Sequence, residues 1–322
     1  MRPTGQLHLG HLVGALDNWA SLQDRYDCFY FVADWHALTS DYADTSAIVP
    51  NAYDMVADWI AAGLDPERST IFVQSMVPEH AELDLLLSMT IPIPWLERVP
   101  TYKEQMEQLS EKDLSTIGFL GYPLLQTADI IIYNAHYVPV GDDQVPHLEL
   151  SREIVRRFHN FFGELFVEPQ PLLTKVPRLP GLDNRKMSKS YNNAINLSDD
   201  EEAVRKKVMQ MYTDPKRVRA DIPGTVEGNP VFTYHDAFNT NTAEVDDLKD
   251  RYRAGKVGDV EVKTKLAKAV NGRLEPIRAR RRELLAKPSA LREILHEGSR
   301  KARLIAGETM ERVRSAVRLK YE

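Results

Sequence analysis

Two histidines near the start of the chain have the types and the spacing needed to hold a polyphosphate. His8 and His11 lie three residues apart and bracket Gly10. They stand at the beginning of residues 10–22, where apolar side chains recur at helical spacing. The N-terminus of a helix presents unpaired N–H groups and the positive end of a dipole to an anion. The pattern therefore predicts that His8 and His11 donate hydrogen bonds to phosphate oxygens.

A second basic group lies near the middle of the chain. Residues 186–190 read Lys-Met-Ser-Lys-Ser, and they follow a loop rich in Gly, Asp and Asn at residues 181–185. Lys186 and Lys189 are three residues apart in this run, so they form a pair of cations. Ammonium groups in such a loop can stabilise the negative charge that develops on a departing pyrophosphate.

Strand and helix signals alternate in the part of the chain that must position both basic groups. Residues 28–33 and 70–74 are short, apolar, β-rich runs typical of buried parallel strands, and residues 47–62 between them have helical periodicity. This alternation predicts an α/β fold with a Rossmann-like, doubly wound parallel sheet. Such sheets bind ligands at the carboxyl ends of their strands, where Asp34 and His36 follow the first run.

The rest of the chain has a different character. After residue 190, amphipathic helical patterns follow one another without strand signals. We therefore expect a Rossmann-like domain at residues 1–190 and an all-helical domain at residues 191–322. Residues 271–322 carry 14 Lys and Arg against 7 Asp and Glu, although the net charge of the whole chain is −6. A basic region on an acidic body fits a polyanionic partner held at one end, and a solvated helix face is the alternative.

Composition excludes several classes of protein. Cys28 is the only cysteine, which excludes an internal disulfide and a cysteine-cluster metal site, and no protein-held metal is expected. No segment approaches the roughly 20 apolar residues needed to cross a bilayer. Residues 1–11 lack the basic-then-apolar layout of a signal peptide. We expect a cytoplasmic protein without a membrane partner.

Taken together and in this order, the two basic groups resemble the signatures of the class I aminoacyl-tRNA synthetases. Residues 2–11 read Arg-Pro-Thr-Gly-Gln-Leu-His-Leu-Gly-His, and Lys-Met-Ser-Lys-Ser follows at residues 186–190. Finer features are similar to those of the tryptophanyl-tRNA synthetases, and they lie at residues 72–75, 128–130, 138–144 and 175–181. The resemblance covers essentially the whole chain.

The resemblance implies a ligase that activates L-tryptophan with ATP and passes it to tRNA(Trp). In this family the carboxylate of the amino acid attacks the α-phosphorus of ATP, which gives tryptophanyl-adenylate and pyrophosphate. The enzyme then needs donors and cations that align two anions, rather than a protein nucleophile. Mg²⁺ would accompany ATP and be held mainly by phosphate oxygens and water. The resemblance also implies a homodimer whose helical domain reads the anticodon of the tRNA.

The resemblance further assigns roles to individual residues. The candidate catalytic residues are His8, His11, Lys186 and Lys189. The candidate ATP contacts are Arg2, Thr4, Gly10, His11, Lys103, Gly141, Asp143, Lys186, Met187, Ser188 and Lys189. The candidate tryptophan contacts are His36, Tyr122, Gln126, Asp129, Val140 and Gln144. Because the indole N–H is only a donor, a buried acceptor such as Asp129 is the selective partner for it.

The sequence departs from the usual tryptophan pattern at one position, which makes tyrosine the alternative amino acid. Tyr122, Gln126 and Asp129 have the spacing Tyr-x3-Gln-x2-Asp, which also resembles the tyrosyl-tRNA synthetases, and most tryptophan enzymes have methionine in place of Gln126. The tyrosine family usually has Gly-Gly-x-Asp-Gln where this chain reads Val-Pro-Val-Gly-Asp-Asp-Gln at residues 138–144. The bulky Val140 suits an apolar slot, so the sequence favours tryptophan.

Two further alternatives stay open, together with an expectation about the first strand. Small nucleotidyltransferases share a His-x-Gly-His motif, although they are typically shorter and lack Lys-Met-Ser-Lys-Ser. A synthetase-like paralogue could bind tRNA without charging it. A doubly wound domain has a strand just before its first phosphate loop, yet only Met1 precedes residues 2–11. We therefore expect that the start of the chain is wrongly placed or truncated by roughly ten residues.

Overall fold

The computed structural model describes residues 1–99, 102, 113–173, 179–187, 191–215, 217 and 219–321. Three candidate site residues, Lys103, Ser188 and Lys189, lie outside the described residues. The helices and strands are, in chain order, α1 (Leu9–His11), α2 (Asp17–Leu22), β1 (Cys28–Val32), α3 (Asp34–Asp41), α4 (Ile48–Ala61), β2 (Ser69–Val73), α5 (Glu79–Ser88), α6 (Ile93–Glu97), α8 (Ile117–Ile131), β3 (Tyr137–Val140), α9 (Val145–Phe162), β4 (Gln170–Leu173), α10 (Glu201–Met209), α11 (Pro230–Phe238), α12 (Thr242–Arg253), α13 (Asp259–Leu285) and α14 (Pro288–Ala316).

The first two strands, β1 and β2, form a parallel pair. Cys28 lies opposite Ser69, and Val32 lies opposite Val73. Both strands consist mainly of apolar residues, with β-branched and aromatic side chains that suit a strand covered on both faces. Helix α4 makes the crossover between them and buries Trp59 completely. The two strands and the helix predicted from residues 28–74 are confirmed.

A second parallel pair is formed by β3 and β4, with Tyr137 opposite Gln170 and Val140 opposite Leu173. Within the described ranges, the two pairs are separate two-stranded sheets rather than one continuous sheet. A cavity lined by residues of both β1 and β3 separates them. The predicted α/β fold with parallel strands and a C-terminal helical region is confirmed, but its sheet is interrupted between β1 and β3.

The segment predicted as a helix at residues 10–22 is helical, with one irregularity. A π-helical turn at Leu12–Leu16 joins α1 to α2. Leu9, Leu12 and Leu16 are fully buried and fix this segment against the core that contains β1. π-helical turns inside helices are rare and occur frequently at functional sites.

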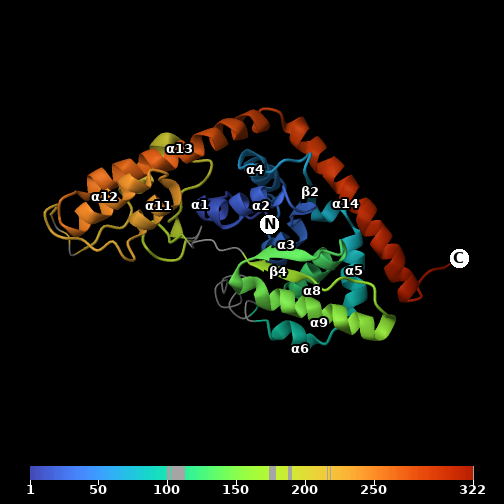
Figure 1. Cartoon of the computed structure of the whole chain (residues 1–322). Helices are drawn as coiled ribbons and strands as arrows, with labels where there is room; N and C mark the ends of the chain where they lie inside the picture. Colours follow the sequence, from blue (N-terminus) through green and yellow to red (C-terminus); the bar gives the residue numbers. More distant parts are fainter. Residues whose placement is uncertain are drawn as a thin grey trace.

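The last two helices carry the chain back to the parallel sheet. Figure 1 shows α13 leading from the cluster of α11 and α12 toward the N-terminal part, and α14 then running past β2 and α5 to the C-terminus. Gly298 of α14 permits this packing, because a Cβ at this position would lie 1.9 Å from the carbonyl oxygen of Ile71 in β2. The domain boundary expected after residue 190 stays a prediction, and α14 packs against both sides of it.

Several basic residues of the C-terminal helices pair with acidic residues of the N-terminal part. The pairs are Arg273 with Asp17, Arg281 with Asp58, Arg303 with Glu79, and Arg314 with Glu82. Part of the positive charge of residues 271–322 is therefore paired with acidic residues of the same chain. Among the helices that the structure describes, each is too short or too polar to span a bilayer.

Candidate functional site

The two basic signatures, far apart in sequence, lie side by side in the structure. The backbone N–H of Leu9 donates to the carbonyl of Ile195 at 2.9 Å, and that of Leu197 donates to Leu7 at 2.9 Å. This antiparallel contact joins residues 7–9 to residues 195–197. Residues 195–197 follow the Lys-Met-Ser-Lys-Ser segment at 186–190, which is called the lysine loop below. The chain that leads out of the lysine loop is thus tied directly to the helix start that carries the two histidines.

Gly10 is the point where the signatures touch. A Cβ at Gly10 would lie 3.0 Å from the His8 ring and 3.1 Å from the Sδ atom of Met187. The His8 and His11 rings have centroids 3.8 Å apart, and the backbone N–H of His8 donates to His11 Nδ1 at 3.1 Å. Because Nδ1 accepts this bond, the neutral His11 ring carries its proton on Nε2. The absence of a side chain at Gly10 lets Met187 approach the histidine pair.

Hydrogen bonds within a turn hold the loop that carries Lys186. Lys186 forms an antiparallel bridge with Pro180, and the N–H of Gly181 donates to the carbonyl of Arg185 at 2.7 Å. Asp183 accepts from Asn193 Nδ2 at 2.8 Å and from the backbone N–H of Arg185 at 3.0 Å. These bonds, that from Asn193 first, lower the pKa of Asp183 to about 2, so it is ionised at neutral pH. The turn is therefore held by a carboxylate, while Lys186 is exposed to solvent.

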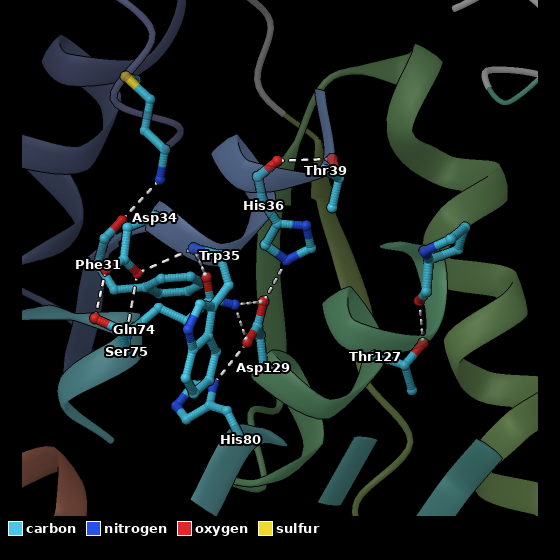
Figure 2. Close-up of polar contacts among 12 residues, drawn as sticks. Phe31, Asp34, Trp35, His36, Thr39, Gln74, Ser75, His80, Thr127 and Asp129 are labelled. Atoms are coloured by element: carbon cyan, nitrogen blue, oxygen red, sulfur yellow. Dashed lines mark hydrogen bonds and ion pairs between the residues drawn. The ribbon is translucent and has the colours of Figure 1, made fainter. Parts of the chain in front are cut away.

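The opposite end of the candidate site is organised around Asp129, which projects from α8 and is 4% exposed (Figure 2). Its Oδ1 accepts from Gln74 Nε2 at 2.8 Å and bonds to His80 Nδ1 at 2.6 Å. Its Oδ2 bonds to His36 Nε2 at 2.7 Å and accepts a second bond from Gln74 at 3.0 Å. Burial alone would raise the pKa of Asp129, but hydrogen bonds and charge from His36 and His80 outweigh it and lower that pKa.

His80 extends this network into the core. The ring is fully buried, and its Nε2 lies 2.7 Å from the hydroxyl of Tyr133. Burial first, and then the charge of Asp129, raises the pKa of Tyr133, so this tyrosine stays protonated. When Nδ1 of His80 donates to Asp129, Nε2 accepts from Tyr133, and one tautomer of the ring satisfies both bonds. The carboxylate is thus fixed on all sides before any ligand arrives.

Gln74, His80 and Tyr133 were not predicted as site residues from the sequence. Gln74 stood in a run that carried the family resemblance, without a role, and it directly follows β2. Its place is a signal that could have identified it, because a polar residue at the carboxyl end of a buried parallel strand is a candidate ligand contact. Nothing in the local pattern places His80 or Tyr133 beside Asp129, because α5 and α8 meet only through tertiary packing.

The predicted tryptophan contacts on α8 share one face of the helix. Tyr122, Gln126 and Asp129 are spaced by four and three residues, so their side chains lie in a row. The ring of Tyr122 lies 5.6 Å from that of His147 on α9, measured between centroids. Gln126 is half-buried between Tyr122 and Asp129. Their contact with an amino acid stays a prediction, and a direct bond from an indole to Asp129 requires exchange of one bond that the carboxylate already accepts.

A compact turn after β3 holds four more candidates. Val140 ends β3 opposite Leu173, and the N–H of Gln144 donates to the carbonyl of Gly141 at 3.0 Å. A Cβ on Gly141 would lie 2.9 Å from Asp143 Oδ1, and Gln144 Nε2 donates to Asp143 Oδ2 at 3.1 Å. The turn therefore depends on glycine and brings two polar side chains to the carboxyl end of a parallel strand, where such folds bind ligands.

Arg2 lies beside α3, and Thr4 follows it closely in the chain. Arg2 donates to the Ser40 hydroxyl and lies 3.8 Å from Asp41. Burial is the largest influence on the Arg2 guanidinium and lowers its pKa, while Asp41 opposes the shift. Thr4 is exposed, and its N–H donates to the carbonyl of Arg2 at 3.0 Å. Their predicted contact with ATP stays a prediction.

Asp34, which follows the first strand together with His36, has a structural role. Its carboxylate accepts from the backbone N–H of Trp35 and of Ser75, each at 3.1 Å, and from the Ser75 hydroxyl (Figure 2). These bonds tie the ends of β1 and β2 together. His36, two residues further along α3, points toward Asp129.

The fold and this arrangement define a class of protein. A sequence model of the family described as tRNA synthetases class I (W and Y) matches residues 1–275. The match covers more than half of the chain, so the chain belongs to this family and is an aminoacyl-tRNA synthetase.

Two relatives and one solved structure that are similar to this chain are tryptophan enzymes by name. The chain is 51% identical to the tryptophan–tRNA ligase of Thermotoga maritima, with 100% of this chain and 98% of that protein covered. It is 43% identical to the tryptophan–tRNA ligase of Aquifex aeolicus, with 99% and 98% covered. The tryptophanyl-tRNA synthetase of Campylobacter jejuni, solved in complex with ADP and tryptophan, superimposes with a TM-score of 0.89 at 33% identity and 98% coverage of both chains.

Proposed function

We infer that this chain is a tryptophan–tRNA ligase, which activates L-tryptophan with ATP and transfers the product to tRNA(Trp). The observation that carries the inference is the contact of the histidine pair with the lysine loop through Gly10 and Met187. The contact supports this inference because the helix start and the loop that carries the exposed Lys186 are neighbours, and both suit the phosphates of a nucleotide. The named relatives, which match over nearly the whole chain, support tryptophan as the amino acid.

We propose the following roles for the residues during activation. His8 and His11 donate to phosphate oxygens, and Lys186 with Lys189 stabilises the charge that passes to pyrophosphate as the carboxylate attacks the α-phosphorus. The bond from the α-phosphorus to the bridging oxygen breaks as the new bond to the carboxylate oxygen forms. Mg²⁺ would accompany ATP and would be held mainly by phosphate oxygens and water. Arg2, Thr4, Gly10, Lys103, Gly141, Asp143, Met187 and Ser188 complete the proposed nucleotide contacts.

Asp129 and its hydrogen-bond partners supply the polar group of the proposed tryptophan pocket. Because Asp129 stays ionised, it favours a ligand that brings an N–H donor and disfavours one that brings an unpaired acceptor. His36, Tyr122, Gln126, Val140 and Gln144 are the other proposed contacts of tryptophan. The binding of tRNA by the helical region, a homodimer and a cytoplasmic location remain proposals that rest on the family.

Exchange of pyrophosphate into ATP, measured with each amino acid in turn, tests the proposal. Exchange that depends on L-tryptophan is the expected result. Exchange that depends on L-tyrosine would assign Gln126 to a tyrosine pocket, and exchange with neither amino acid would identify a tRNA-binding paralogue without synthetase activity. Charging of tRNA(Trp) with labelled tryptophan then tests the second step.

A further inference from the structure

Tyr133, which follows the end of α8, is connected to Asp129 through the ring of His80. The hydroxyl of Tyr133 lies 2.7 Å from His80 Nε2, and His80 Nδ1 lies 2.6 Å from Asp129 Oδ1 (Figure 2 shows the bond to Asp129). The two ring nitrogens of one buried histidine thus join the hydroxyl to the carboxylate. A change at Tyr133 can therefore reach Asp129 only through the state of His80.

Aromatic side chains of the first strand pair fix the ring of Tyr133. Phe29 of β1 stacks on it with centroids 4.9 Å apart and an interplanar angle of 22°. Phe72 of β2 meets it edge-on, with centroids 5.6 Å apart and an angle of 67°. Both arrangements are favourable for aromatic pairs. Packing therefore holds the hydroxyl of Tyr133 in place against His80, which is itself fully buried.

The protonation of the two groups sets the direction of their bond. The pKa of Tyr133 is raised, mainly by burial and next by the charge of Asp129, so the hydroxyl keeps its proton. When that proton is donated to Nε2, the neutral His80 ring carries its own proton on Nδ1 and donates it to Asp129. The other neutral tautomer would turn a lone pair of Nδ1 toward the ionised carboxylate, which is repulsive.

We propose that Tyr133 is a positioning residue for tryptophan recognition, because it fixes the tautomer in which His80 donates to Asp129. The proposal rests on the proposed ligase function, in which Asp129 accepts from the indole N–H. A second bond of the same kind supports it. The backbone N–H of Trp35 donates to Gln74 Oε1 at 3.2 Å, so the Nε2 group of Gln74 faces Asp129. Two donors to the carboxylate are thus each oriented by a further hydrogen bond behind them.

Loss of the Tyr133 hydroxyl should weaken selection of the amino acid rather than catalysis. The substitution Tyr133→Phe leaves Nε2 of His80 without a donor in the core. Because an unpaired buried acceptor is costly, the ring should turn from its present orientation, and its bond to Asp129 Oδ1 is weakened or lost. A less firmly oriented acceptor discriminates less between a ligand that brings an N–H group and one that does not.

The tautomer of His80 can be measured directly in the unsubstituted chain. NMR of chain with nitrogen-15-labelled histidine, assigned with the variant His80→Asn, should show a proton on Nδ1 and none on Nε2 at neutral pH. A proton on Nε2 would overturn the proposal, whether the ring is neutral or charged. This measurement involves neither catalysis nor a change at Tyr133, so it decides the matter even if Tyr133→Phe does not fold.

Amino-acid-dependent exchange of pyrophosphate into ATP measures selection. The two amino acids are L-tryptophan and its benzothiophene analogue, in which sulfur replaces the indole N–H. In Tyr133→Phe we expect kcat/KM for tryptophan to fall by about tenfold, while kcat/KM for the analogue and the KM for ATP change by less than about twofold. The matched control is Tyr30→Phe, which removes another buried-ring hydroxyl, bonded to the carbonyl of Trp19 at 3.1 Å, and should leave the preference for tryptophan unchanged.

A double-mutant cycle tests whether Tyr133 acts through His80. His80→Asn places an amide donor near the position of Nδ1 without a ring tautomer, so adding Tyr133→Phe to it should not reduce the preference for tryptophan further. A reduction as large as in the unsubstituted background would overturn the proposal, as would equal losses for tryptophan and the analogue in Tyr133→Phe. If the unsubstituted chain shows no tryptophan-dependent exchange, the ligase function itself is refuted, and this role is refuted with it.

Discussion

The two ends of the candidate site are built in opposite ways. Asp129 is buried, and each of its oxygens is held by two hydrogen bonds from Gln74, His36 and His80. Lys186 stands on a short turn and is exposed to solvent, and among the described residues its backbone is held by the bridge to Pro180 and a bond from Asn193. One end is thus a buried, preorganised acceptor, and the other is an exposed cation.

This difference fits two separate tasks. Selection between similar amino acids requires polar groups that are already oriented, because a mismatched ligand then leaves a buried group unpaired. Stabilisation of charge on pyrophosphate requires contact that strengthens only as the reaction proceeds, so its loss affects the rate more than the affinity. Substitutions at the two ends should therefore separate stability and tryptophan binding from the rate of activation.

The largest expected effect is that of Asp129→Ala. The change leaves donors of Gln74, His36 and His80 unpaired in the core, so the free energy of unfolding should fall by about 3–5 kcal/mol. The KM for tryptophan should rise by roughly tenfold or more. Urea unfolding and tryptophan-dependent ATP–pyrophosphate exchange measure the two effects. Asp129→Asn is the matched control of equal size, and an unchanged KM in both variants would remove Asp129 from the pocket.

Lys186→Ala should give the contrasting result. The rate of exchange should fall by about 100-fold, because a cation aimed at developing charge is lost, while KM for tryptophan and the free energy of unfolding stay unchanged. Lys206→Ala, which removes an exposed lysine of α10, is the control and should leave all three quantities as they are. Equal losses in rate and tryptophan affinity for Lys186→Ala would contradict its role.

Asp58 is a second buried carboxylate, and its pKa is shifted in the direction opposite to that of Asp129. Asp58 is as buried as Asp129 but has mainly one partner, Arg281 at 2.8 Å, so burial prevails and raises its pKa to about 6. Asp58 therefore binds a proton more tightly in the folded state, and its contribution to stability declines as pH rises from about 4 to about 6. Asp129, with its lowered pKa, has the opposite sign and stabilises the fold above the pKa of an unfolded aspartate.

The substitution Asp58→Asn tests whether the contribution of Asp58 to stability declines as the pH rises. Relative to the unsubstituted chain, the variant should become more stable as the pH is raised from 5 to 7, with a change on the order of 1–2 kcal/mol. Arg281 keeps Asp54 as a partner at 3.0 Å, which limits the loss of the ion pair. Urea unfolding at each pH provides the measurement. A stability difference that does not vary with pH would show that Asp58 is ionised throughout this range.

The smallest effect is expected for Gly10→Ala. The new Cβ must displace the His8 ring and Met187 by a few tenths of an ångström, so the KM for ATP should rise by about fivefold, equivalent to about 1 kcal/mol, with little change in stability. Gly14→Ala is the matched control, because a Cβ there meets nothing within 4 Å. If both substitutions raise the KM for ATP equally, the close approach of Met187 is not responsible.

The elements of the catalytic region were predictable because their signals are local. Residues 28–33 and 70–74 are apolar runs with β-branched and aromatic residues, and they form β1 and β2 with bounds shifted by one residue at most. The helix after His8 was also predictable, but its π-helical turn was not, since the same leucine spacing suits a regular helix. Local periodicity therefore identifies elements but not the irregularities within them.

The candidate site was only partly predictable. His8, His11, Lys186 and Asp129 were identified from residue type and family resemblance, whereas Gln74, His80 and Tyr133 were found only in the structure. The basic excess of residues 271–322 was interpreted as a surface for a polyanion, yet four of its arginines pair with acidic residues of the N-terminal part. A charge count does not reveal such pairs, because the partners are distant in sequence.

The amino-acid sequence alone determined the chemistry that this protein offers: a histidine pair at a helix start, a lysine-bearing loop, and a carboxylate in an apolar helix. These groups can be identified from residue types and short spacings, which are properties of the sequence and do not depend on the fold. Only the tertiary structure decided that Met187 meets Gly10, that three residues orient Asp129, and that a cavity separates β1 from β3. Each of these depends on the packing of segments that are remote in sequence, which local patterns do not specify.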